Sequence, residues 1–156
     1  MAGPNPIDYF AIRNTIATYC VALDTQDWQL LRKVFTEDVD ATYPFSGQIR
    51  GVQKVADGIR NRLTPITSQH ALTTQTIEIA KDGKTATATT YFTGIHFGKG
   101  KWQGQQVTAW GKYEDVLVLT DGEGIPGSSG HWLISKRVVG FMGRLGEEGV
   151  MRGEDG

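Results

Sequence analysis

The spacing of apolar residues changes once along this chain, at Pro65, and no other feature constrains the fold as much. Before Pro65, apolar side chains recur every three or four residues, which is typical of amphipathic helices. After it, they alternate with threonine and other polar residues, which is typical of half-buried strands. The pattern predicts an α+β fold, with three N-terminal helices packed against a strongly curved, mainly antiparallel sheet. We expect the sheet to form a cone with an internal pocket.

Start and stop signals place the three helices. Asn5 and Pro6 open the first, which we expect to end at Asp24, and Asp27 can cap a second that runs through Phe35. The third follows Gly51 and stops before Pro65. Between the second and third helices, residues 41–45 are expected to form a short strand, placed near a sheet edge by Pro44.

Four strands are expected after Pro65, over residues 72–79, 85–97, 105–120 and 131–142. Asp82-Gly83 is a hairpin signal between the first two. A glycine-rich stretch, residues 121–130, joins the last two. Residues 143–156 include five glycines and no core pattern. We therefore expect a single domain over residues 1–142, followed by a flexible glycine-rich tail over 143–156.

Charge and composition exclude several classes of protein. The 156 residues carry a net charge of −1 with no basic block, so neither nucleic acid nor an anionic membrane surface is an expected partner. No apolar run approaches the length of a membrane span, and the N-terminus lacks the pattern of a secretory signal. Cys20 is the only cysteine, which precludes an internal disulfide and suggests the cytoplasm. We expect it to be a buried, inert thiol.

Four residues could carry chemistry: Asp24, Tyr43, His70 and His96. A histidine paired with a carboxylate is held in one tautomer and becomes a stronger base, while a tyrosine hydroxyl can polarise a carbonyl. Such a set suits proton abstraction beside a carbonyl, followed by elimination or isomerisation, without cofactor or metal. Each residue also has an ordinary explanation, as a helix cap, a core side chain or a surface group. A metal site is not supported by any tight ligand spacing.

Aromatic residues are expected to line the cone and bind a small, flat, apolar, lightly oxygenated substrate. The candidates for this role are Tyr19, Trp28, Phe35, Tyr91, Trp110, Tyr113 and Phe141.

Three segments resemble a known superfamily. The run from Tyr19 to Phe35, and the segments Gly111–Asp115 and Trp132–Arg137, are similar to the nuclear transport factor 2-like, SnoaL-like superfamily. This resemblance covers about residues 7–142 and implies the cone fold, which hosts many activities. Members of this fold commonly form dimers or trimers, so a homodimer or homotrimer is expected.

Within that superfamily the sequence most resembles the scytalone dehydratases, which are cofactor-free. The resemblance implies that Asp24 orients His96 as the general base, that His70 assists departure of a hydroxyl, and that Tyr43 polarises a carbonyl through water. Three family positions differ, because Leu23, Gly111 and Tyr113 replace a tyrosine, a serine and an asparagine. The resemblance therefore implies a retained proton-transfer core and a different substrate.

The sequence thus favours a cofactor-independent lyase or isomerase acting on a polyketide- or terpenoid-like carbonyl compound in secondary metabolism. Two alternatives stay open. A cyclase or pericyclase would shape its substrate with Trp110, Tyr113 or Phe141, whereas a non-catalytic subunit would bind an apolar ligand without turnover.

Overall fold

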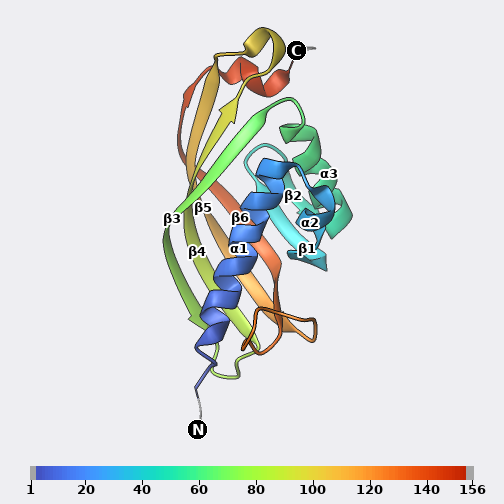
Figure 1. The fold of residues 1–156 in the computed structure, drawn as a ribbon, viewed down its shortest axis with the longest axis vertical. Helices are drawn as coiled ribbons and strands as arrows, with labels where there is room; N and C mark the ends of the chain where they lie inside the picture. The colour runs from blue at the N-terminus through green and yellow to red at the C-terminus, as the bar shows by residue number, and fades with distance from the viewer. Residues whose placement is uncertain (1–2, 154–156) are drawn as a thin grey trace.

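One six-stranded sheet organises the computed structural model, which describes residues 3–153 (Figure 1). The strand order is β2-β1-β6-β5-β4-β3, and every neighbouring pair is antiparallel except β1 and β6. The strands are β1 (Phe35–Tyr43), β2 (Gly47–Arg50), β3 (Thr67–Ile79), β4 (Thr85–Phe97), β5 (Gln106–Thr120) and β6 (His131–Gly146). The expected α+β class with a mainly antiparallel sheet is confirmed.

The long helix α1 (Ile7–Thr25) crosses the inner face of the sheet (Figure 1). Ile12, Ile16, Tyr19 and Leu23 follow helical spacing and are buried against the strands. The helix ends at Gln26, whose left-handed backbone (φ 54°) reverses the chain. The Gln26 amide donates to the carbonyls of Leu63 and Ile66, both at 3.0 Å, and so fixes this end of α1 beside the start of β3.

The helices α2 (Trp28–Arg32) and α3 (Val52–Leu63) lie at one end of the sheet with β1 and β2 (Figure 1). Asp27 caps α2 as expected, accepting from the Leu30 backbone N–H at 2.9 Å. The expected extent of this helix was wrong, because Phe35 begins β1 and pairs with β6. The strand expected near a sheet edge over residues 41–45 is the end of β1, which lies one strand from the edge, and Pro44 falls in the turn after it. β2, which was not predicted, forms the edge itself.

The hairpin predicted at Asp82-Gly83 joins β3 to β4, with Gly83 at φ 69°. The third strand begins at Thr67, five residues earlier than predicted, which extends the sheet past His70. The 98–104 connection contains a short 3-10 helix, η1 (Gly100–Trp102). No helix within residues 3–153 is long and apolar enough to cross a membrane.

The expected loose tail was wrong for residues 143–153. Strand β6 continues to Gly146, and η2 (Glu148–Arg152) folds back on the end of the sheet (Figure 1). Val150 is fully buried, Gly149 packs against Trp102, and the Trp102 indole N–H donates to the Gly153 carbonyl at 2.8 Å. These glycines permit close packing rather than mobility. Residues 154–156 lie outside the described residues.

Candidate active site

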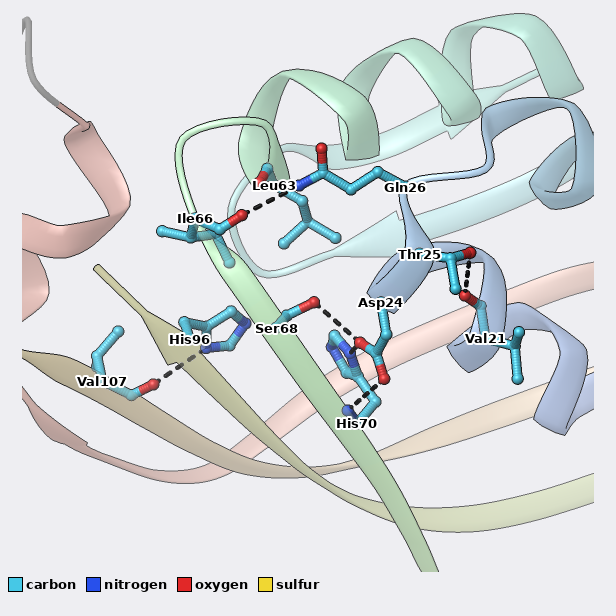
Figure 2. A network of polar contacts seen from close by, with 10 residues as sticks. All are labelled: Val21, Asp24, Thr25, Gln26, Leu63, Ile66, Ser68, His70, His96 and Val107. Atoms are coloured by element: carbon cyan, nitrogen blue, oxygen red, sulfur yellow. Dashed lines mark hydrogen bonds and ion pairs between the residues drawn. The ribbon is translucent and has the colours of Figure 1, made fainter. Parts of the chain in front are cut away.

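A carboxylate–imidazole pair joins the last turn of α1 to β3 (Figure 2). The Asp24 carboxylate lies 2.7 Å from Nδ1 of His70 and also accepts from the His70 backbone N–H at 2.8 Å. The Ser68 hydroxyl donates to the same carboxylate at 2.9 Å. Because the carboxylate accepts, the neutral imidazole of His70 has its proton on Nδ1 and its lone pair on Nε2. This is the arrangement of an oriented general base.

This geometry corrects the partner expected for Asp24. The carboxylate bonds His70 rather than His96, because β3 lies directly against α1 and presents Ser68 and His70 on that side. His96 is on the next strand, and its Nδ1 lies 3.1 Å from the Val107 carbonyl (Figure 2). His70, and not His96, is therefore the histidine with a carboxylate partner.

His96 is buried and neutral. Burial, and next the electrostatic effect of the neighbouring His70, lower the pKa of His96 to about 4. Its Nδ1–H donates to the Val107 carbonyl, which leaves Nε2 as an acceptor. At neutral pH His96 is a weak base that can accept a hydrogen bond from a hydroxyl group of a ligand.

The imidazole rings of His70 and His96 lie next to each other, and both are close to Gly94. Their ring centroids are 5.8 Å apart with the planes nearly perpendicular. A Cβ atom at Gly94 would lie 3.3 Å from Nε2 of His70 and 3.4 Å from Cε1 of His96. Gly94 on β4 lies opposite His70 on β3, and it is on the same face of the sheet as His96. Nε2 of His70 therefore points to the inside of the cone.

The inside of the cone is a cavity that is open to solvent. Three of the four residues predicted to be catalytic line it: Tyr43, His70 and His96. Asp24 lies behind His70 and contacts it from the helix side. The remaining wall is mostly apolar, from Leu23, Ile59, Leu63, Phe92 and Val139 among others. An apolar wall with a few polar groups is typical of a small-molecule site.

Two phenols bring hydroxyl groups to the floor of this cavity. The hydroxyl oxygens of Tyr19 and Tyr43 are 3.0 Å apart, so one donates to the other. Tyr113 lies beside them, edge-on to Tyr19 and stacked on Phe92 at 4.5 Å. Burial raises the pKa of all three phenols, which therefore stay protonated as hydrogen-bond donors.

Behind the phenols lies a fully buried ion pair. Arg137 binds Asp115 through Nε and Nη2, at 2.7 and 2.8 Å. Its guanidinium stacks on the rings of Tyr19 and Tyr113, at 4.2 and 4.0 Å from their centroids. The pair thus fixes the rings that carry the hydroxyl groups.

The aromatic residues expected to bind substrate divide into two groups. Tyr19, Tyr113 and Phe141 line the cavity. The prediction was wrong for Trp28, Phe35, Tyr91 and Trp110, which are not part of its wall. Tyr91 and Trp110 alternate with inward-facing neighbours and are more than a third exposed on the outer face of the sheet, while Phe35 packs behind Tyr19. Trp28 packs against the core from α2.

Sequence reasoning missed several lining residues, of which Phe45, Arg62, Phe92 and Arg144 matter most. Phe92 could have been found, because it has the same alternation as His96 on β4. Arg62 is one position from Leu63 on the buried side of α3. Arg144 gave no signal, since it lies in the segment expected to be a loose tail.

The remaining candidate groups have other surroundings. Cys20 is buried, and burial raises the pKa of its thiol to about 12, in keeping with an inert side chain. No group of three or more His, Cys, Asp or Glu side chains suited to a metal occurs within residues 3–153.

The helices, the curved sheet and the cavity between them define an α+β cone. Residues 7–138 match the model of the SnoaL-like domain, and the chain belongs to that family. A search of curated proteins by sequence finds no match.

Solved structures with the same fold are numerous and distant in sequence. A protein provisionally named scytalone dehydratase from Novosphingobium aromaticivorans is 17% identical, with a TM-score of 0.77 over 92% of this chain and 90% of that one. A hexachlorocyclohexane dehydrochlorinase, LinA-type3 from Novosphingobium barchaimii, is 15% identical, with a TM-score of 0.74 over 92% of each chain. A protein of unknown function from Mycobacterium tuberculosis is 21% identical, with a TM-score of 0.71 over 86% of this chain and 72% of that one. These likenesses show the fold alone.

Proposed function

We propose that this protein is a cofactor-independent lyase or isomerase that removes a proton from carbon beside a carbonyl group. The observation that carries the proposal is the Asp24–His70 pair, whose free Nε2 points into an apolar cavity. Similarity of fold to a dehydrochlorinase and to a protein named as a dehydratase is consistent with elimination chemistry. The substrate class we infer is a polyketide- or terpenoid-like carbonyl compound of secondary metabolism.

The positions of the groups support the following reaction. Nε2 of His70 takes the proton from carbon, and Asp24 stabilises the imidazolium that forms. The electron pair moves onto the carbonyl oxygen, where the phenols of Tyr43 and Tyr19 can donate a hydrogen bond to the enolate. Return of the proton to another carbon gives isomerisation. Alternatively, the enolate collapses with loss of a β-hydroxyl group, which takes the proton and leaves as water.

The test uses deuterium exchange at carbon, which needs only the first step. We choose 2-tetralone, a flat bicyclic ketone, in D₂O at neutral pH and follow loss of its α-hydrogen signals by NMR. The wild-type protein should accelerate exchange, and His70→Gln and Asp24→Asn should each reduce it by roughly 10²–10⁴-fold, with the circular dichroism spectrum unchanged.

His131→Gln is the matched control, because His131 begins β6 and does not line the cavity. Its exchange rate should equal that of the wild type. A His70→Gln protein that exchanges as fast as wild type would refute the general base. Binding of 2-tetralone without any exchange would instead favour the non-catalytic ligand-binding subunit.

A further inference from the structure

Two arginines line the cavity, and they are its only charged side chains apart from the histidines among the described lining residues. Arg62, in the last turn of α3, stacks on Phe45 with its guanidinium carbon 4.3 Å from the ring centroid. Arg144, near the end of β6, lies 5.0 Å from the centroid of Phe141 in the same way. All four side chains line the cavity. Stacking on a ring holds a guanidinium plane in place and leaves its N–H edge free for a ligand.

The hydrogen bonds of Arg144 use two of the three guanidinium nitrogens and leave Nη1 available to a ligand. Its Nε and Nη2 bind Glu148, at 2.9 and 2.8 Å. Its Nη1 is buried and has no hydrogen-bond partner within residues 3–153. Leaving a buried donor of a charged group unsatisfied is costly, so such a donor is expected to have a partner when the site is filled.

The charges of these two arginines are not balanced. Arg62 makes no hydrogen bond or salt bridge within the part of the chain that the structure describes, and Glu148 is the one carboxylate bound to Arg144. Burial, and next the charge of Arg144, lower the pKa of Arg62, so the two cations are close enough to repel each other. Among the described residues that line the cavity, none is acidic. A ligand with a negative charge would relieve this repulsion.

We propose that Arg62 and Arg144 form an anion subsite, and that the natural substrate is a carboxylate whose apolar body fills the cavity. The carboxylate would accept from Nη1 of Arg144 and from the guanidinium of Arg62. The reacting carbon would lie beside Nε2 of His70, which lines the same cavity. This last point rests on the proposed function, whereas the anion subsite itself depends only on the two arginines.

The test compares two ligands that differ in charge and hardly in shape, 2-naphthoate and 2-naphthamide. Their binding to the wild-type protein is measured by titration calorimetry, and naphthoate should bind at least ~10-fold more tightly. Arg62→Gln and Arg144→Gln should each remove most of this preference while changing the affinity for naphthamide by less than about twofold. Equal affinity of the two ligands for the wild type, or no binding of either, would overturn the subsite, and this result does not depend on how the variants fold.

Arg60→Gln is the matched control, because Arg60 lies on the same helix, pairs with Asp57 and does not line the cavity. Loss of naphthoate affinity in Arg60→Gln equal to that in Arg62→Gln would mean that only the overall charge matters, and would also overturn the proposal. Failure of the two proposals can be told apart. Tight naphthoate binding without deuterium exchange on 2-tetralone refutes the general base alone, whereas exchange without a preference for the carboxylate refutes the subsite alone.

Discussion

Gly94 makes room for both imidazoles of the cavity, and a single methyl group there would press on them. In Gly94→Ala the new Cβ would lie 3.2 Å from Cδ2 and 3.3 Å from Nε2 of His70. His70 cannot retreat freely, because Asp24 binds both its ring and its backbone. Small displacements of a catalytic group reduce the rate steeply. We expect exchange on 2-tetralone to fall about 3- to 30-fold.

The control for this prediction is Gly143→Ala on β6, where an added Cβ would meet nothing within 4 Å. The same exchange assay should give the wild-type rate for that protein. A Gly94→Ala protein with unchanged exchange would mean that the position of Nε2 is not critical.

His96 makes the stability of the protein depend on pH. Its pKa of about 4 in the folded state is below the ordinary value, about 6.5, that it takes in the unfolded chain. Between these values the unfolded state binds more protons, so the free energy of unfolding falls as pH decreases from about 6.5 to 4. The loss at the lower limit is about 3 kcal/mol.

Urea unfolding at pH 7 and at pH 4.5 measures this loss. His96→Gln should show a smaller decrease than the wild type by about 2 kcal/mol, whereas His131→Gln should behave as the wild type. Equal decreases in wild type and His96→Gln would contradict a neutral, buried His96.

At the scale of elements, alternation along single strands was readable from the sequence, and pairing between distant segments was not. The hairpin at Asp82-Gly83 and the strand over residues 85–97 were predicted because turn chemistry and period are local. Phe35 was assigned to a helix because its place in β1 depends on parallel pairing with β6, almost a hundred residues later. Pairing of that kind leaves no local pattern.

In the candidate site, too, residue types could be predicted from the sequence, whereas contacts between distant segments could not. His70 and His96 could be proposed from residue type, and they do share the cavity. Which of them binds Asp24 depends on the packing of α1 against β3, which the sequence does not specify. Tyr91 and Trp110 were wrongly predicted to line the cavity. Phe92 and Tyr113 face the inside of the sheet, and alternation along β4 and β5 places Tyr91 and Trp110 on the outer face.

The C-terminal element η2 is held by close contacts at its glycines. A Cβ at Gly149 would collide with the indole ring of Trp102, whose N–H already donates to Gly153. Gly149→Ala should therefore lower the free energy of unfolding by about 1–3 kcal/mol. Urea denaturation measures this change. Gly140→Ala, where an added Cβ meets nothing within 4 Å, should stay within about 0.5 kcal/mol of the wild type. Equal stability of the two variants would mean that η2 does not depend on this contact.

At the scale of the whole molecule, the outer face of the sheet carries several large apolar side chains that are exposed. Tyr91, Trp110, Met142 and Leu145, on the adjacent strands β4, β5 and β6, are 39, 38, 56 and 71% exposed. Large apolar side chains grouped on one exposed face are a feature of interaction surfaces. We propose that a second copy of this chain covers this face, in a dimer or a trimer.

Light scattering on the purified protein tests this prediction. The wild type should have a mass of two or three times 17.1 kDa at micromolar concentration. Trp110→Glu places a charge among these apolar side chains, where its desolvation is costly, and should shift the mass toward that of one chain.

Phe10→Glu is the control, because Phe10 is 58% exposed but lies on α1, on the opposite side of the sheet. A wild-type mass of one chain would show that the outer face stays uncovered in solution. An oligomer that survives Trp110→Glu but is lost in Phe10→Glu would place the contact on α1.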